Sequence, residues 1–212
     1  ENISLSYLPI GNRVKLRLTA TGENLKNLET DLDQEIEKLK PLIQEKVISW
    51  SGNEIHEILK EILTNRKLSL STAESCTGGE LAKLLTSVSG SSKYFLGGVI
   101  TYEAQKKVQI LDVSEKTISE KTTVSEEVAQ EMSFGCQQLF QTDISLSTTG
   151  VSGPNTDEFN NEIGTVFYSI RVKNFEKTNR LYLPHLERND FANFVSQRVL
   201  QDLVEILVHE KY

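Results

Sequence analysis

The beginning of the chain combines two hydrophobic periods. Apolar residues occupy alternate positions over residues 3–7 and again over 14–18, on either side of the sequence Pro-Ile-Gly-Asn at 9–12. A period of two on both sides of a turn predicts a β-hairpin with one buried face. A period of three to four residues follows and predicts an amphipathic helix. The apolar stripe of this helix consists of Leu25, Leu28, Leu32, Ile36, Leu39 and Ile43.

Residues 1–50 and 51–212 are predicted to form separate domains. The sequence Ser-Trp-Ser-Gly-Asn at 49–53 breaks both periods and is interpreted as the linker. The first part is a β-β-α unit too small to bury much apolar surface alone, so we expect it to pack on another structure. After the linker, Ser51 and Glu54 have the spacing of a capping box and predict the start of a helix.

The larger part alternates between strand and helix patterns. Strands are predicted near residues 68–73, 98–102 and 144–149, with a late hairpin over 163–172 and 180–183. Helices are predicted over 78–85 and 125–140, and from Asp190 onwards; in the helix over 125–140 the inward residues are Val128, Met132, Cys136 and Leu139. This alternation predicts a three-layer α/β/α sandwich with a mixed sheet, preceded by the small α+β connector domain.

Composition narrows the classes of function. The 212 residues carry a net charge of -7, and most of the excess lies in residues 51–212. This balance argues against a protein that mainly holds nucleic-acid backbone, whereas a small anionic ligand needs only one Arg and a helix N-terminus. No apolar run reaches the ~20 residues that span a bilayer. Two cysteines without a signal peptide predict a reduced, cytoplasmic location and no disulfide scaffold.

Residues 72–80 are the most informative stretch for chemistry. A run of hydroxyl and glycine residues follows a predicted strand, and Thr77 with Glu80 predicts a second capping box. Ser75 and Cys76 are thereby placed on a strand-to-helix turn, whose free N–H groups can hold a phosphate or an oxyanion. A well-capped helix start with no ligand explains the same local pattern, because such turns are common in α/β folds.

Two further stretches follow predicted strands in the same way. The Gly-Gly pair at 97–98 precedes Lys106 and Lys107, and hydroxyls and glycines recur over 148–154. A lysine beside a serine can act as a general base when burial lowers its pKa, although a solvated lysine pair on a helix is the alternative. At most one of two adjacent lysines points inward. Because ligands in open α/β sheets bind at the carboxyl ends of strands, the three loops are predicted to converge on one crevice.

Other catalytic and metal-binding patterns are weak. The sequence contains no Walker loop and no G-x-G-x-x-G, and its three histidines lack metal-ligand spacing. Cys136 fits a core helix position. Cys76 is a nucleophile in principle, but neither cysteine has a histidine at a sequence spacing that indicates a catalytic Cys-His pair.

The three loops, in this order, resemble the CinA family and specifically its C-terminal nicotinamide-nucleotide amidase (NMN deamidase) domain. The matching strings are Ala-Glu-Ser-Cys-Thr-Gly-Gly at 73–79, Gly-Gly-Val-Ile-Thr-Tyr at 97–102 with Lys107, Val-Ser-Glu-Glu-Val-Ala at 124–129, Thr-Gly-Val-Ser-Gly-Pro at 149–154 and Gly-Thr-Val at 164–166. The similarity covers about residues 53–207, and the first string is its most specific part.

The first domain also resembles a known part of this family. Residues 1–50 are similar to the small KH-like connector that precedes the amidase domain in full-length members. Those members carry a further N-terminal domain that resembles molybdopterin-binding proteins and is associated with ADP-ribose pyrophosphatase activity. Because the sequence begins at Glu1 rather than Met, we expect it to be part of a longer protein.

The resemblance implies hydrolysis of the carboxamide of nicotinamide mononucleotide to nicotinate mononucleotide and ammonia, with no metal or other cofactor. It implies Ser75 as the nucleophile and Lys107, neutral in a partly buried site, as the base. Tyr102 would orient this lysine or relay its proton. Thr149 would be a hydrogen-bonding partner in the same crevice.

The resemblance also implies a set of substrate-binding residues. The N–H groups of residues 76–79 would hold either the oxyanion or the phosphate, and the sequence leaves both alternatives open. Arg188 would pair with the phosphate. The whole set is Cys76, Thr77, Gly78, Gly79, Gly150, Gly153 and Arg188. We further expect a homodimer or higher homo-oligomer with no membrane or nucleic-acid partner.

The sequence departs from the family pattern near the expected phosphate. Residues 155–162 replace a glycine-rich loop with an acidic, Asn-rich one, which is consistent with a mobile flap or an exposed turn. Glu187 stands before Arg188 in place of the usual glycine, and Ala192 replaces a second arginine. Added acid near an anionic ligand weakens its binding, so these changes concern the phosphate and leave the nucleophile region intact.

Two other functions remain as alternatives. A non-catalytic interaction module of a competence- or damage-associated protein would not need Ser75 and Lys107 within hydrogen-bond reach. A nucleic-acid binder acting through the KH-like segment would need a G-x-x-G loop, and residues 1–50 contain only Gly11 and Gly22. The amidase is therefore the favoured hypothesis.

Overall fold

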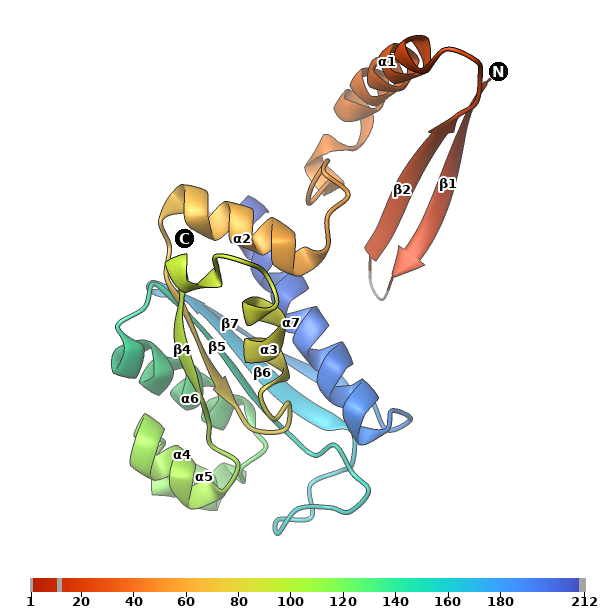
Figure 1. The fold of residues 1–212 in the computed structure, drawn as a ribbon. Coiled ribbons are helices and arrows are strands. Elements are labelled where there is room, and N and C mark those ends of the chain that lie inside the picture. Colours follow the sequence, from red (N-terminus) through yellow and green to blue (C-terminus); the bar gives the residue numbers. More distant parts are fainter. Residues whose placement is uncertain (1, 11–12, 210–212) are drawn as a thin grey trace. The chain divides into compact units, whose positions relative to one another are not determined.

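The computed structural model describes residues 2–10 and 13–209, which form two compact units, Glu1–Asn53 and Glu54–Tyr212 (Figure 1). Each unit is described by itself. Within the described residues, no helix combines the length and the apolar character needed to cross a membrane.

The first unit contains the predicted hairpin and helix. Strand β1 (Ile3–Ile10) pairs antiparallel with β2 (Arg13–Ala20) along their whole length. Helix α1 (Leu25–Ile43) begins where the Asn24 side chain accepts a hydrogen bond from the Asn27 N–H. A short 3-10 turn, η1 (Gln44–Lys46), follows it. Part of the expected hairpin turn at 9–12 lies outside the described residues.

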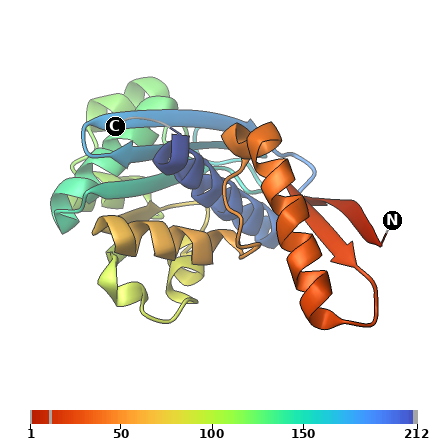
Figure 2. The same ribbon diagram turned by 90° about the horizontal axis from the view of Figure 1, so that it is seen from above.

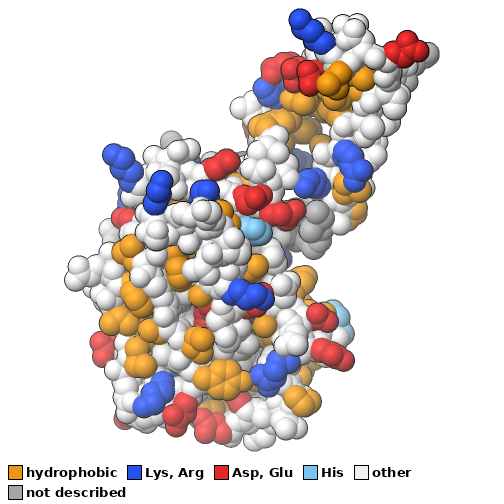
Figure 3. Space-filling model, viewed as in Figure 1, with side chains coloured by type: hydrophobic (Ala, Val, Ile, Leu, Met, Phe, Trp, Pro, Cys, Tyr) orange, Lys and Arg blue, Asp and Glu red, His pale blue; other side chains and the backbone are white. Residues whose placement is uncertain are grey.

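The expected buried face of the hairpin is not buried. Leu5, Tyr7, Val14 and Leu16 share one face of the two strands, and their exposed fractions run from 37% to 67%. Among residues 2–9 and 14–53 none is buried, because a single helix cannot cover a two-stranded sheet. Hydrophobic side chains therefore lie open on the surface of this unit (Figure 3).

The second unit is built on a mixed five-stranded sheet, in the order β4-β3-β5-β6-β7. Strand β3 (Leu70–Glu74) is parallel to both of its neighbours, β4 (Phe95–Ile100) and the central strand β5 (Ile144–Gly150). The hairpin β6 (Thr165–Val172) and β7 (Phe175–Tyr182) adds antiparallel strands beyond β5. Every residue of β3 is buried, as expected for a strand covered on both faces.

Helices cover both faces of this sheet (Figures 1 and 2). One layer contains α2 (Ile55–Arg66), α3 (Glu80–Thr86) and α7 (Arg188–His209). The other contains α4 (Ala104–Leu111), α5 (Glu115–Lys121) and α6 (Glu126–Phe140). A 3-10 turn, η2 (Ser91–Lys93), precedes β4. The predicted three-layer α/β/α sandwich with a mixed sheet is confirmed; helices α4 and α5 were not among the predicted elements.

The hydrophobic period of helix α6 predicts most of its buried residues correctly and one of them wrongly. Val128, Met132 and Cys136 are fully buried in a cluster with Leu111 and other residues, as predicted. The prediction for Leu139 was wrong, because this side chain is half-exposed while its neighbour Phe140 packs on the cluster.

The start of α2 also differs from the prediction. The Ser51 hydroxyl contacts Ser49 and accepts from the Asn53 N–H instead of capping a helix. Glu54 is the N-cap residue, and it forms the capping box with Glu57. The predicted box at residues 51–54 was therefore displaced by three residues, because a second acidic residue with suitable spacing follows.

A glycine in α6 fixes the position of α4. A Cβ atom on Gly135 would lie 1.9 Å from the carbonyl oxygen of Leu111, the last residue of α4. Such a contact with backbone cannot be relieved by turning a side chain. The two helices therefore need glycine at this position to reach their observed separation.

We expect Gly135→Ala to lower the free energy of unfolding by about 2–3 kcal/mol, since added volume in a tight contact forces a backbone shift. Chemical denaturation measures the loss, with Phe134→Ala as the control at the adjacent, half-exposed position. A Gly135→Ala chain as stable as wild type would show that α4 and α6 are not in close contact.

Candidate active site

The three loops singled out from the sequence meet at one edge of the sheet. Strands β4, β3 and β5 are parallel, and Glu74 at the end of β3 pairs with Ile100 on one side and Thr148 on the other. The chain continues in register beyond the strand, since the Ser75 N–H donates to the Thr148 carbonyl oxygen and the Thr101 N–H donates to that of Glu74. Parallel strands thus bring the three loops together at their carboxyl ends.

A cavity of ≈ 420 Å³ lies at this edge. Its walls come from the turn after β3, the β4–α4 connection, the loop after β5 and the start of α7. Of the residues proposed for the site, it is lined by Ser75, Cys76, Tyr102, Lys107, Thr149, Gly150, Gly153 and Arg188. Thr77, Gly78 and Gly79 do not line it.

Lys107 and Ser75 are in direct contact at the wall of this cavity. The Lys107 Nζ lies 3.0 Å from the Ser75 Oγ, although the residues are 32 positions apart. The same Nζ donates to the carbonyl oxygens of Thr101 and Tyr102, at 2.6 Å and 3.2 Å. Lys107 is 1% exposed, whereas the adjacent Lys106 faces outward, so only one lysine of the pair points inward.

Burial makes the ammonium form of Lys107 a stronger acid than that of an ordinary lysine. Desolvation lowers the pKa of Lys107 to about 8, while Cys76 and the carboxylate of Glu158 oppose this change. At this pKa a substantial fraction of the amine is neutral near physiological pH. A neutral amine has two N–H bonds and one lone pair. When the two carbonyl oxygens accept its N–H bonds, the lone pair remains for the Ser75 hydroxyl.

Cys76 is placed beside Ser75 but its chemistry differs. Burial raises the pKa of the Cys76 thiol to about 12, so the thiolate is not formed at neutral pH. Burial likewise raises the pKa of Cys136, to about 11. Of the Ser75 and Cys76 side chains, the Ser75 hydroxyl is therefore the one beside which the structure places an amine of lowered pKa.

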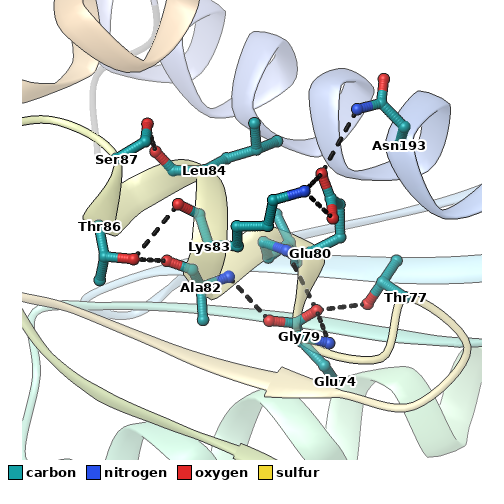
Figure 4. A network of polar contacts seen from close by, with 11 residues as sticks. Glu74, Thr77, Gly79, Glu80, Ala82, Lys83, Leu84, Thr86, Ser87 and Asn193 are labelled. Atoms are coloured by element: carbon teal, nitrogen blue, oxygen red, sulfur yellow. Dashed lines mark hydrogen bonds and ion pairs between the residues drawn. The ribbon is translucent and has the colours of Figure 1, made fainter.

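A buried carboxylate organises the turn that carries Ser75. Glu74 is 1% exposed, and its side chain accepts hydrogen bonds from the N–H groups of Gly79, Leu81 and Ala82 (Figure 4). The Thr77 hydroxyl donates to the same carboxylate at 2.7 Å. Glu74 thus caps helix α3 from the preceding strand and complements its positive end.

This cap replaces the expected one. Thr77 with Glu80 was predicted to form a capping box, but the Thr77 hydroxyl contacts Glu74 and Thr148. Glu80 instead forms an ion pair with Lys83 (Figure 4). The sequence rule failed because a carboxylate three residues before Thr77 reaches the same N–H groups.

Two of the proposed ligand donors are already used within the turn. The Gly79 N–H is held by Glu74, and the Gly78 N–H donates to the Ser75 carbonyl oxygen. The anion-binding capacity of the α3 N-terminus is therefore satisfied internally. Among the residues that follow Ser75 in this turn, Cys76 lines the cavity, whereas residues 77–79 do not.

Tyr102 and Arg188 lie together on the cavity wall. Arg188 donates to the Tyr102 hydroxyl at 2.9 Å and to the Gly153 carbonyl oxygen at 2.6 Å. The Tyr102 hydroxyl thus contacts the arginine, while its backbone carbonyl accepts from Lys107. Tyr102 therefore orients the lysine through its main chain. The Thr149 hydroxyl donates to the Thr123 carbonyl oxygen and retains its capacity to accept.

Sequence reasoning missed two contributors to the site. The Thr101 carbonyl oxygen makes the shortest contact of Lys107, and Glu158 lines the cavity from the acidic loop. A backbone carbonyl leaves no trace in residue identity, so Thr101 could not be found. Glu158 could have been identified from the sequence, since it lies in the loop 155–162, whose acidic residues set it apart from the family pattern.

The glycine pair at 97–98 serves packing between elements. A Cβ atom on Gly98 would lie 2.2 Å from the Thr72 hydroxyl oxygen, and one on Gly97 would meet the Phe140 ring. Neither glycine lines the cavity. Within residues 2–10 and 13–209, no group of three His, Cys, Asp or Glu side chains is arranged to hold a metal ion.

Comparison with known protein families gives a consistent match. A family described as the CinA C-terminal domain matches residues 52–207. A CinA-like protein from Flavobacterium psychrophilum is 42% identical over 169 residues, which is 79% of this chain and 40% of that protein. A CinA-like protein from Desulfotalea psychrophila is 31% identical over 210 residues, covering 96% of this chain and 51% of its own length. The chain thus spans about half or less of the length of these relatives.

Solved structures show the same fold. The crystal structure of competence damage-inducible protein A from Klebsiella pneumoniae has a TM-score of 0.71 and 30% identity, covering 75% of this chain and 100% of that one. A competence-damaged protein (CinA) superfamily protein from Escherichia coli has a TM-score of 0.69 and 29% identity, covering 77% and 98%.

We expect Glu74→Gln to lower the free energy of unfolding by about 2–3 kcal/mol, because an amide NH₂ cannot accept the N–H bonds that one carboxylate oxygen accepts. Glu80→Gln is the matched control in the first turn of the same helix, where the ion pair with the exposed Lys83 contributes about 0–1 kcal/mol. Thermal or chemical denaturation compares the two. Equal stability of both variants would contradict the capping role of Glu74.

Proposed function

The chain belongs to the CinA family, and on this premise we propose that its second unit hydrolyses the carboxamide of nicotinamide mononucleotide to nicotinate mononucleotide and ammonia. The observation that carries the proposal is the contact of 3.0 Å between Lys107 Nζ and Ser75 Oγ at the wall of a ligand-sized cavity. A serine needs an adjacent base to become a nucleophile, and a lysine needs a lowered pKa to act as that base.

In the first half of the reaction, the Ser75 Oγ attacks the carboxamide carbon while its proton passes to the neutral Nζ of Lys107. The resulting ammonium is held by the Thr101 and Tyr102 carbonyl oxygens. As the tetrahedral intermediate collapses, Lys107 gives this proton to the departing nitrogen, and ammonia leaves. The nicotinyl group is then esterified to Ser75.

The second half repeats the proton transfers with water. Lys107, neutral again, takes a proton from a water molecule that attacks the ester carbon. It then returns a proton to the Ser75 Oγ as the carboxylate product leaves. The balance is one amide and one water consumed, with one carboxylate and one ammonium ion formed in solution.

The negative charge that develops on the carbonyl oxygen needs a donor near Ser75. The Gly78 and Gly79 N–H groups are already used, so we assign this role to the backbone N–H of Cys76, which follows the nucleophile directly. At the other end of the substrate, we assign the phosphate to Arg188, whose side chain lines the cavity.

We expect the chain to release ammonia from nicotinamide mononucleotide, and Ser75→Ala to reduce this rate at least about a thousandfold, because the attacking oxygen is removed. A coupled ammonia assay measures the rate, and the melting temperature shows that the variant folds. Ser87→Ala, at the exposed C-terminal end of α3, is the control and should keep the wild-type rate.

A folded wild-type chain that releases no ammonia from nicotinamide mononucleotide, nicotinamide riboside or nicotinamide would contradict the proposal. That result would favour the non-catalytic interaction module, which requires no reaction at Ser75.

The rate should also report the ionisation of Lys107. Because only the neutral amine accepts the serine proton, kcat/KM is expected to rise with pH and to level off above a midpoint near pH 8, the lowered pKa of Lys107. Lys107→Arg should be inactive throughout, since a guanidinium stays protonated. A rate that is independent of pH between 6 and 9 would remove Lys107 from the role of base.

A further inference from the structure

The acidic loop after β5 is fixed to the body of the second unit on both sides of Glu158. The Asp157 carboxylate accepts hydrogen bonds from the N–H groups of Phe159 and Asn161 and from the Thr123 hydroxyl. The Asn161 side chain also contacts the Thr122 hydroxyl. This segment of the loop is therefore tied to the connection that precedes α6.

The residue after Glu158 is anchored in the apolar core. Phe159 is partly buried and packs on the cluster that contains Leu111 and Met132. Asp157 is held by hydrogen bonds on one side of Glu158, and Phe159 is held by packing on the other. Glu158 lies between these anchors, is exposed to solvent and lines the cavity.

The charges that face the cavity come from three elements. Lys107 lies on α4, with Glu103 at its N-cap, and Arg188 begins α7. The loop contributes Asp157, whose carboxylate is occupied by its own loop, and Glu158. The uncharged titratable groups there are Cys76 and Tyr102. Arg188 is thus opposed by acidic side chains in the same cavity.

We propose that Glu158 determines the charge selectivity of this cavity, so that it accepts pyridinium carboxamides and favours the phosphorylated form less than Arg188 alone would. The proposal rests on the amidase function proposed above and deepens it to a class of substrate. A ring nitrogen that carries the ribose is positively charged, and a carboxylate attracts it. The same carboxylate repels a phosphate of charge near -2.

Glu158 also acts on the base of the reaction. Its negative charge favours the ammonium form of Lys107 and so raises the pKa of that lysine against the larger effect of burial. Removal of this charge should lower the pKa of Lys107. The acid limb of the kcat/KM profile should then move to lower pH, which a purely structural role of Glu158 would not cause.

The test uses binding in the absence of turnover. The Ser75→Ala chain, with and without Glu158→Gln, is titrated calorimetrically with nicotinamide mononucleotide and with nicotinamide riboside at low ionic strength. We expect Glu158→Gln to increase the preference for the phosphorylated ligand about fivefold, the size expected when one carboxylate and a phosphate of charge about -2 lie about 9 Å apart in a watery cleft.

Glu162→Gln is the matched control in the same loop. Glu162 accepts from the Tyr182 hydroxyl and lies near Arg180, and it does not line the cavity. This variant should leave the ratio of the two affinities unchanged. An equal change in both variants would mean that only the net charge of the chain matters, and it would overturn the role of Glu158.

The outcomes separate this inference from the proposed function. An unchanged affinity ratio in Glu158→Gln, or no binding of either ligand, overturns the inference. The expected ratio without ammonia release by the chain that retains Ser75 overturns the amidase function alone. The chain can also release ammonia while Glu158→Gln changes neither the affinity ratio of the two ligands nor the acid limb of the kcat/KM profile. That result would support the amidase function and overturn the role of Glu158 in selectivity.

Discussion

The burial of one amine beside one hydroxyl is the constraint on which the rest of the site depends. Lys107 is almost fully enclosed, and its Nζ meets Ser75 Oγ and two backbone carbonyl oxygens. Each of these groups comes from a different place in the chain. The serine follows β3, the carbonyls follow β4, and the lysine lies on α4, which is held against α6 by the close approach at Gly135. The parallel pairing of β3 and β4 therefore determines whether the contact exists.

Two positive groups lie at this edge of the sheet. The N-terminus of α3 is used for structure, whereas Arg188 is left for a ligand. Glu74 satisfies the N-terminus of α3, so the turn that carries Ser75 is rigid but no longer a general anion site. Arg188 lines the same cavity, where it bridges the Tyr102 hydroxyl and the Gly153 carbonyl oxygen. In the proposed reaction the two ends of the substrate are thus held by different elements, with the amide near β3 and the anionic end near α7.

Much of the fold was predictable because periodicity is a local property. The first hairpin, three of the four predicted inward residues of α6 and the late hairpin of the sheet followed from it. The burial of the first hairpin was not predictable, because exposure depends on what else covers Leu5 and Tyr7. The same holds for helix caps, since Thr77 fitted a sequence rule but a buried Glu74 reached the N–H groups instead.

The pairing of Ser75 with Lys107 was expected from a resemblance, whereas local pattern alone favoured a solvated lysine pair on a helix. The part played by backbone carbonyls could not be read from residue types at all. The central claim is that burial makes Lys107 a base, and it is tested most directly by an NMR titration of its side chain after selective isotope labelling. The account predicts a midpoint near pH 8 for Lys107. A midpoint near 10.4, the value of an ordinary solvated lysine, would contradict it.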